Sequence, residues 1–320
     1  MYSGNDAIDF LAKEIYKFDN SSSSHWQKYH SKFKFNGNGF EGLQGFGGHS
    51  KPRGKLTGFI EKILQYRFRK MAGRNFSMLD NLAHEVTIKQ NRNYDLDVLR
   101  QALTISFLND RAPNLLNDKA IGCVIGDGFG SMSLLLLLSR SANRVILVNL
   151  TKTLMVDLWY LKLYMGDHMF KSSVDLISNS EELQAALVKP TSNLFGNVIA
   201  IQADNHQILK DCKADFILNI ASMQEMNPAT IGSYFEDIRS IADKKKVVFY
   251  CCNREEKTLP DGTVTRFSEY PFHPGDNVMI DSLCPWHQYY YSFKPPFYRS
   301  YDGPLRHRLV EMINNKEKQL

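Results

Sequence analysis

Three glycines at alternate positions follow an apolar run near the middle of the chain and form its most informative motif. Residues 120–130 read A-I-G-C-V-I-G-D-G-F-G, in which Gly126, Gly128 and Gly130 close the run. Glycine has no Cβ and tolerates positive φ, so the backbone of such a loop can approach a ligand closely. Residues 131–140 then read as a buried helix. A strand, a glycine loop and a helix in this order predict a nucleotide-like ligand at the loop.

Polar side chains stand at the ends of three other apolar runs in the same region. They are Asn149, then Asp204 with Asn205, and then Asn219. Ligands of open α/β sheets bind outside the carboxyl ends of the strands, so these side chains are candidates for binding the same ligand as the glycine loop. For Asn149 and Asp204 a second interpretation stays open, because each also stands where a side chain caps the next helix.

Predicted strands and helices alternate from about residue 120 to residue 255, and these elements must position the candidate residues. Apolar runs predict strands at 121–125, 144–150, 197–203, 215–220 and 246–252. The stretches between them predict helices at 131–140, 151–165, 181–188 and 230–242. Continuous apolar strands that alternate with helices indicate a parallel sheet covered on both faces. The predicted fold class is therefore α/β, with a doubly wound, Rossmann-like sheet. Residues 174–178 are either an additional strand or part of an insertion.

The remaining segments differ in character, which predicts three parts of the chain. Residues 1–115 are expected to form a helical N-terminal cap or substrate lobe, with helices at 55–72 and 94–108. Residues 116–270 are expected to form the Rossmann-like, ligand-binding domain. Residues 271–320 are rich in aromatic residues and proline, and we expect them to pack on that domain as an irregular extension.

Composition places the chain among globular proteins. Of its 320 residues, 43% are hydrophobic and 23% are charged, which are ordinary values for a folded protein. No apolar run approaches the ~20 residues of a membrane-spanning helix. The first residues lack the basic start and apolar core of a secretion signal. We therefore expect a cytoplasmic protein with no membrane span.

The five cysteines predict reduced, mostly buried thiols. Their number is odd, and Cys251 and Cys252 are adjacent rather than in a C-x-x-C spacing, so they predict neither a zinc site nor redox chemistry. No cluster of carboxylates and histidines has the spacing of ligands to a divalent ion, so no metal is expected.

Basic residues gather between positions 51 and 74 of a chain whose formal net charge is +5. Eight lysines and arginines face a single acid there, Glu61. Such a run either attracts anionic substrates or forms a solvated helix face. Nucleic acid is not expected as a partner, because no base-stacking or groove-reading motif accompanies the charge.

The spacing of the glycines separates two kinds of nucleotide-binding loop. A dinucleotide fingerprint reads G-x-G-x-x-G, whereas the three glycines here give G-x-G-x-G, which resembles motif I of class I S-adenosylmethionine-dependent methyltransferases. The strings N-I-A-S-M-Q-E-M at 219–226 and I-L-V-N-L-T-K-T-L at 146–154, with Trp26 in S-S-H-W, resemble those of bacterial sugar O-methyltransferases. The resemblance covers about residues 20–300.

The resemblance implies S-adenosyl-L-methionine as the cofactor and a set of residues that hold it. The implied cofactor-binding residues are Gly126, Asp127, Gly128, Gly130, Asn149, Asp204, Asn205 and Asn219. Asn149 would hold the ribose hydroxyls, Asp204 and Asn205 would lie near the adenine, and Asn219 would lie beside the point of methyl transfer. Two positions depart from the family's pattern. Val124 stands where an acid is usual, an absence for which Asp127 would partly substitute, and Asn149 replaces an acidic residue.

The implied reaction is methyl transfer to a hydroxyl of a sugar, with a small sugar, a nucleotide-sugar or a polysaccharide as the acceptor. A sugar hydroxyl is a poor nucleophile at neutral pH, so a general base is expected. Glu225 is the first candidate and His287 the second, because histidine titrates in the useful range. Gln224 is expected to orient the substrate. Glu225 alternatively serves as a helix N-terminal acid, and His287 alternatively as a packed residue.

Other interpretations stay open beside this one. Trp286 and the tyrosines at 289–291 either form an aromatic surface for a sugar ring or pack within the protein. The chain is alternatively a methyltransferase for another small molecule, or a binding protein that has the methyltransferase fold but has lost the catalytic activity. The glycine spacing counts against a third alternative, an NAD-dependent oxidoreductase. Assembly into a homo-oligomer is left open.

Overall fold

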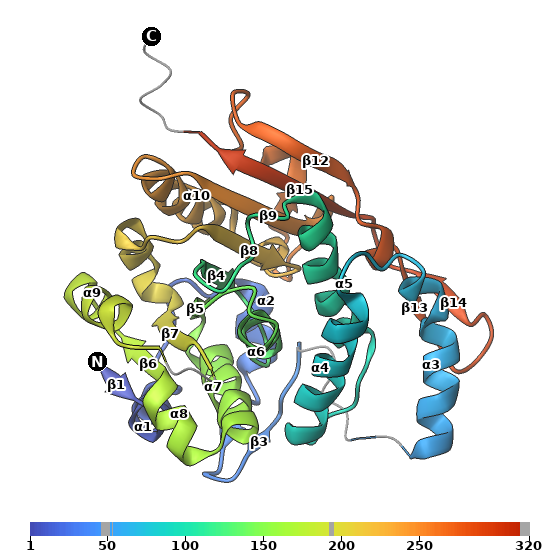
Figure 1. Cartoon of the computed structure of the whole chain (residues 1–320), viewed down its shortest axis with the longest axis horizontal. Helices are drawn as coiled ribbons and strands as arrows, with labels where there is room; N and C mark the ends of the chain where they lie inside the picture. The colour runs from blue at the N-terminus through green and yellow to red at the C-terminus, as the bar shows by residue number, and fades with distance from the viewer. Residues whose placement is uncertain (46–51, 53, 192–194, 314–320) are drawn as a thin grey trace.

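One mixed sheet organises the computed structural model, which describes residues 1–45, 52, 54–191 and 195–313 (Figure 1). Within these residues the sheet has nine strands. Their order is β1 (Tyr2–Ser3), β6 (Val174–Ile177), β7 (Asn197–Gln202), β5 (Arg144–Asn149), β4 (Ile121–Ile125), β8 (Phe216–Ile220), β9 (Val247–Arg254), β15 (Leu305–Met312) and β12 (Asn277–Leu283). The strands from β6 to β9 in this order run parallel, whereas β1 and β15 run antiparallel to their neighbours.

Two hydrophobic layers cover the sheet, one on each face. Val124 of β4 belongs to one layer, and its neighbours Cys123 and Ile125 belong to the other, as the alternation of side chains along a strand requires. The first layer includes α4 (Phe76–Lys89), α5 (Leu96–Arg111), α6 (Ser131–Leu138) and α7 (Thr151–Met165). The second includes α9 (Ser180–Val188), α10 (Pro228–Ala242) and the 3-10 segment η1 (Ala203–Asp211). Figure 1 shows α4, α5 and α6 on the opposite side of the sheet from α9 and α10.

These layers confirm the predicted fold class, a doubly wound, Rossmann-like α/β sheet. Each of the five predicted strands and each of the four predicted helices between them is present, with small differences at their ends. The undecided segment near residue 175 is a strand, β6, which pairs with β7 and β1. The three predicted parts of the chain stay a prediction.

Among its described residues, the N-terminal third contains the two predicted helices and three further helices. The predicted ones are α3 (Lys55–Arg69) and α5, and the additional ones are α1 (Asn5–Glu14), α2 (Ser24–His30) and α4. The first residues belong to the main sheet, because β1 pairs with β6 and α1 packs against α7. Among the described residues no helix has the length and the apolar character that crossing a membrane requires.

The C-terminal segment is more regular than predicted, because two of its strands extend the main sheet. In β15 the sequence L-R-H-R-L-V-E-M places buried and half-buried residues largely in alternation. Its charged residues interrupt the apolar ones, so the strand does not read as an apolar run. Arg306 and Arg308 pair with Asp281 of β12 at 2.8 and 2.7 Å. Two short hairpins precede β15, formed by β10 (Glu256–Thr258) with β11 (Val264–Arg266) and by β13 (Tyr289–Tyr291) with β14 (Tyr298–Ser300).

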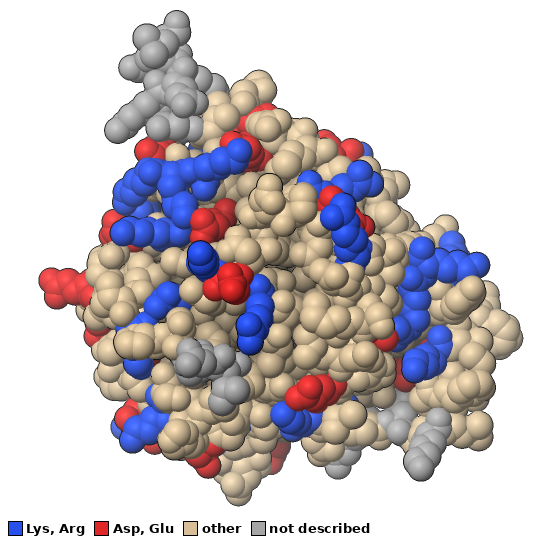
Figure 2. Space-filling model, in the orientation of Figure 1, with Lys and Arg blue, Asp and Glu red and all other residues tan. Residues whose placement is uncertain are grey.

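Several arginines of the basic run at 51–74 have partners within the chain. The Nη1 atom of Arg69 lies 2.6 Å from a carboxylate oxygen of Asp80, and the guanidinium of Arg67 lies 4.1 Å from the ring centre of Tyr289. Figure 2 shows lysines and arginines interspersed with acidic side chains over one face of the molecule. These contacts favour a structural role for Arg67 and Arg69 over attraction of an anionic substrate, whereas Lys51 and Arg53 lie outside the described residues.

Candidate active site

A cavity of about 280 Å³ opens at the carboxyl ends of β4, β5 and β8. The chain leaves β4 toward β5 and β7 on one side and later adds β8 and β9 on the other, so the cavity lies where the strand order reverses, the usual ligand site of such sheets. The predicted site residues among its walls are Gly126, Asp127, Gly128, Asn149, Glu225 and His287. Its other walls include Trp26, Arg92, Asp97, Arg100, Gln101 and Ser222.

The glycine loop has the backbone that its sequence predicted. Gly126, Gly128 and Gly130 have φ angles of +78°, +97° and +62°. A Cβ on Gly126 would lie 2.2 Å from Oγ of Ser222, and one on Gly130 would lie 2.8 Å from Cγ of Leu161. The loop therefore needs glycine at Gly126 and Gly130 for two independent reasons, the positive φ and the lack of space.

Asp127 caps the helix that follows the loop. Its carboxylate accepts hydrogen bonds from the backbone N–H groups of Met132 and Ser133, at 3.0 and 2.7 Å. These groups belong to the first turn of α6, whose N-cap, Gly130, has no side chain to serve them. Burial raises the pKa of Asp127, although the two hydrogen bonds oppose that rise. Asp127 thus brings a carboxylate to the cavity wall and occupies the start of the helix.

A second buried carboxylate, Asp157 of α7, supports the loop from behind. It accepts hydrogen bonds from the backbone N–H of Gly130 at 3.0 Å and from Nδ2 of Asn149 at 2.8 Å. Its side chain is fully buried, and burial together with the charge of Asp127 raises its pKa well above the ordinary value. Asp157 was not among the predicted site residues, although an acid inside the apolar helix predicted at 151–165 was a detectable signal.

Asn149 is the last residue of β5 and lines the cavity beside the glycine loop. Its Oδ1 accepts a hydrogen bond from the backbone N–H of Leu150 at 3.0 Å, while its Nδ2 donates to Asp157. Thr151 then begins α7, whose N-cap residue, Leu150, forms no capping bond with its side chain. The amide of Asn149 is thereby held in place at the cavity wall.

A segment from the N-terminal region, residues 19–26, lies across the ends of three strands, and we call it the N-terminal strap. Asp19 accepts hydrogen bonds from the backbone and the hydroxyl of Thr151, which follows β5. Asp204, which follows β7, accepts hydrogen bonds from the backbone N–H groups of Asn20 and Ser21 at 2.8 and 2.7 Å. The strap is therefore tied to the sheet, and both carboxylate oxygens of Asp204 bind it.

A smaller pocket lies beside the main cavity, under the strap. Its walls are mostly apolar and include Ile125, Val148, Leu150, Ala203, Met226, Thr230 and Tyr234. The two hollows share the wall residues Trp26, Gly126, Asn149, Ser222 and Glu225. Asp204 and Asn205 line neither hollow. Asn205 has non-helical backbone angles and interrupts η1.

Glu225 is held in an ion-paired position. Its Oε1 lies 2.8 Å from Nζ of Lys257 and 3.4 Å from Nε2 of His25. Burial by itself raises the pKa of this carboxyl, but the neighbouring His25 and Lys257 outweigh it, so the pKa of Glu225 is lowered. A carboxylate with a lowered pKa is a weaker proton acceptor than a free one.

Gln224 and Asn219 connect the strand ends rather than lining the cavity. Oε1 of Gln224 accepts a hydrogen bond from the backbone N–H of Arg254 at 2.8 Å. Asn219 donates to the backbone oxygen of Ile125 at 2.9 Å and accepts from Nδ2 of Asn253 at 2.8 Å. These side chains join β4, β8 and β9 at the edge where the cavity opens.

His287 lines the cavity from the 3-10 turn η4 (Pro285–His287). Its Nδ1 lies 3.3 Å from Sγ of Cys284 and 3.8 Å from Sγ of Cys252. Burial lowers the pKa of His287, while the neighbouring Cys284 opposes that change. Trp286 is only 1% exposed and packs edge-on against Phe107, so it is a core residue and offers no surface to a sugar ring.

Polar side chains from α5 form another wall of the cavity. Arg100 donates to the backbone oxygens of Trp286 and Tyr289 at 3.0 and 2.7 Å and to Asp97 at 2.9 Å. Asp97 and Gln101 lie near it on the same helix and also line the cavity. The sequence analysis placed a helix here but did not assign its side chains to the site.

No family model and no curated protein matches the chain. Solved structures that resemble it include M. capricolum TrmK in complex with S-adenosyl-homocysteine, at 11% identity and a TM-score of 0.36, covering 65% of this chain and 68% of that one. Another is magnesium protoporphyrin IX methyltransferase (ChlM) from Synechocystis PCC 6803 with bound SAM, at 9% identity and a TM-score of 0.35, covering 82% of this chain and 100% of that one.

Proposed function

We propose that this protein transfers a methyl group from S-adenosyl-L-methionine to a hydroxyl of a sugar or glycoconjugate. One observation carries the choice of cofactor, namely the position of Asp127. A dinucleotide places its pyrophosphate on the free N–H groups of the helix that follows the glycine loop. Here the N–H groups of Met132 and Ser133 already bind Asp127, whose carboxylate repels phosphate. S-adenosyl-L-methionine instead brings two positive groups, a sulfonium and an ammonium.

The residues around the two hollows suit the parts of this cofactor. The glycine loop and Asp127 would hold the amino-acid part, and Asn149 would hold the ribose. The adenine ring, which is flat and largely apolar on its faces, would lie against Ile125, Val148 and Leu150, and the pocket of about 20 Å³ at these residues must widen to admit it. When bound, the cofactor supplies an electrophilic methyl group, and the protein supplies position and charge.

The composition of the main cavity favours a polyhydroxylated acceptor. Asp97 and Gln101 offer donors and acceptors along one wall, where Arg100 holds the adjoining backbone, and Trp26 offers an aromatic face along another. Sugars combine hydroxyl groups with apolar ring faces, so they suit a wall of this kind. Because Glu225 is ion-paired and its pKa is lowered, we propose that it orients its neighbours rather than removing the proton of the acceptor.

Calorimetry on the full chain tests the choice of cofactor. We expect S-adenosyl-L-methionine and S-adenosylhomocysteine to bind and NAD not to bind, because of the capped helix at the glycine loop. Binding of NAD alone, or of none of the three at millimolar concentration, would overturn the proposal.

A labelled methyl group then identifies the class of acceptor. The chain is incubated with methyl-labelled S-adenosyl-L-methionine and with monosaccharides, nucleotide-sugars or polysaccharides, and the product is analysed by mass spectrometry. We expect the label in an O-methyl ether. Label in an N-methyl group would favour a methyltransferase for another small molecule. Cofactor binding without transfer to any acceptor would favour a binding protein with degraded chemistry.

A further inference from the structure

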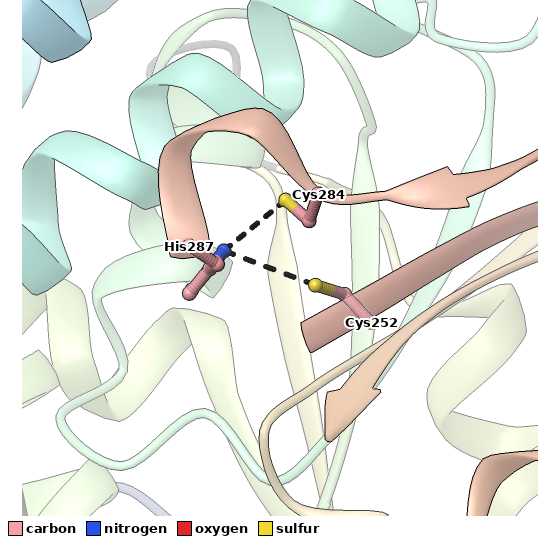
Figure 3. A group of neighbouring side chains, drawn as sticks. All are labelled: Cys252, Cys284 and His287. Carbon is pink, nitrogen blue, oxygen red and sulfur yellow. Dashed lines mark hydrogen bonds between the residues drawn. The ribbon is translucent and has the colours of Figure 1, made fainter. Parts of the chain in front are cut away.

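Three side chains that attract metal ions converge behind the wall of the main cavity (Figure 3). Cys252 belongs to β9, Cys284 follows the end of β12, and His287 ends the turn η4. Their ligand atoms, Sγ, Sγ and Nδ1, all lie within 4.8 Å of one another, and all three residues are buried. Figure 3 shows both sulfur atoms and the ring nitrogen facing a common point.

We propose that Cys252, Cys284 and His287 form a binding site for a divalent metal ion, with zinc as the best match. A tetrahedral zinc ion with bonds of about 2.3 Å to sulfur and about 2.0 Å to nitrogen sets its ligand atoms roughly 3.5 to 3.8 Å apart. The distances from Nδ1 of His287 to the two sulfur atoms are 3.3 and 3.8 Å. Small shifts of these side chains therefore suffice to coordinate the ion.

The charges of this group also suit a divalent ion. Cysteine binds a metal as thiolate and histidine as neutral imidazole. Two thiolates and one imidazole carry a charge of −2, which an ion of charge +2 cancels. A neutral complex removes the large cost of burying an unpaired charge, which matters because Cys252 and Cys284 are both 0% exposed. Sulfur and imidazole together select zinc over magnesium and calcium, which prefer oxygen ligands.

The surroundings leave the fourth coordination position to a molecule from outside the protein. His307 lies nearby, but its Nδ1 is 3.1 Å from the hydroxyl of Tyr250 and its Nε2 is 3.0 Å from Oγ of Ser282. Within the described part of the chain the group contains three His, Cys, Asp or Glu ligands. Zinc sites with three protein ligands bind water or substrate as the fourth, and His287 borders the main cavity.

The proposal does not depend on methyl transfer, because it is tested by metal binding alone. The metal content of the full chain, purified without chelators, is measured by mass spectrometry. The chelator-treated protein is then titrated with Co²⁺, whose thiolate complexes absorb in the near ultraviolet. We expect about one ion per chain and a sulfur-to-cobalt band. Absence of zinc together with absence of the band would overturn the proposal.

Matched variants locate the site. We expect Cys252→Ser, Cys284→Ser and His287→Gln each to lower zinc affinity at least tenfold. Cys251→Ser is the control, because Cys251 is equally buried but belongs to the layer on the other face of the sheet. Unchanged affinity in the three variants would overturn the proposal. If the variants fail to fold, as judged by circular dichroism, the cobalt titration of the unchanged protein decides.

A disulfide is the competing use of the two cysteines. Alkylation of the unfolded chain without reductant, followed by mass spectrometry, counts the free thiols. We expect all five cysteines to be free once the metal is removed. A bond between Cys252 and Cys284 in the protein as purified, with no bound metal, would contradict the proposal.

Discussion

At the scale of single residues, Asp127 is the group that decides which ligand the glycine loop prefers. Asp127→Asn removes the charge but keeps an oxygen for one of the two capping hydrogen bonds. We expect it to weaken S-adenosyl-L-methionine and S-adenosylhomocysteine alike, each about tenfold or on the order of 1 kcal/mol, because both carry the ammonium group that Asp127 would hold. Calorimetry with both ligands measures the two affinities.

The pH dependence and a control sharpen this test. Burial raises the pKa of Asp127, so protonation weakens binding of the cation as the pH falls toward that raised value. The loss thus begins at a higher pH than for an exposed aspartate. Asp118→Asn changes the same kind of group at an exposed position and leaves both affinities unchanged. Unchanged affinity for both ligands in Asp127→Asn would contradict the assigned role.

Gly126 tests whether the loop needs glycine for its backbone angle or for space. In Gly126→Ala the new Cβ meets Oγ of Ser222 at 2.2 Å and φ is +78°, so we expect a loss of about 2 kcal/mol or more in stability, measured by urea unfolding. Gly262→Ala is the matched control, because Gly262 has a φ of +88° with nothing within 4 Å of the new Cβ. Equal losses in the two variants would show that the contact with Ser222 does not matter.

The ion pair of Glu225 gives a stability effect with a defined pH dependence. Glu225→Gln leaves Lys257, whose side chain is 15% exposed, without its partner, so we expect a loss of roughly 1–3 kcal/mol at pH 7. The pKa of Glu225 is lowered from its ordinary value of 4.5. Its stabilisation is therefore fully present above pH 4.5 and is lost as the pH falls through the lowered value.

Urea unfolding of the unchanged protein and of Glu225→Gln at pH 7 and in acid measures this. The difference between the two proteins should shrink in acid. Glu256→Gln is the control, since Glu256 forms an exposed pair with Arg266 at 2.8 Å and exposed pairs contribute little. A difference for Glu225→Gln that stays constant into acid would contradict the ion pair.

At the scale of elements, the N-terminal strap connects ligand binding to a spectroscopic signal. Trp26 of the strap lines both hollows, so a ligand there changes the surroundings of its indole. We expect S-adenosylhomocysteine to change tryptophan fluorescence, and Trp26→Phe to abolish the change. Trp159→Phe is the control, because Trp159 packs against Phe35 and Phe40 instead. A signal that survives Trp26→Phe would mean that the ligand binds elsewhere.

The elements differ in how well the sequence predicted them. The strands β4, β5, β7, β8 and β9 were predictable because they are buried on both faces and therefore read as continuous apolar runs. β15 was not, because Arg306, Arg308 and Glu311 interrupt its apolar residues, and both arginines pair with Asp281 of β12. Its place between β9 and β12 depends on contacts distant in sequence.

The residues of the candidate site also differ in how well the sequence predicted them. The glycine loop and Asn149 were predictable because their types and their place after a strand are local properties of the sequence. The role of Asp157 behind the loop, and the meeting of Cys252 with Cys284, depend on tertiary packing between segments far apart in the chain. For the meeting of Cys252 with Cys284, the only local signal in the sequence was the short spacing C-P-W-H at 284–287.

At the scale of the whole molecule, β15 holds one end of the sheet together. It pairs with β9 along eight residues and also with β12. A chain that ends at residue 304 loses both ladders, so we expect it to lose cooperative unfolding and to aggregate through the open edge of β9. A chain that ends at Ile313 keeps β15 and is the control. Thermal unfolding and light scattering compare the two, and a soluble, cooperative shorter chain would contradict this role.

The position of β15 also sets an order of events during synthesis on the ribosome. Residues 277–283 of β12 are made before residues 305–312 of β15, yet they reach the sheet only through β15. The parallel strands can assemble as they emerge, and β12 must wait for the last strand. A nascent chain therefore completes its glycine loop early and the wall at His287 late, so every newly made molecule passes through a stage with an unfinished pocket.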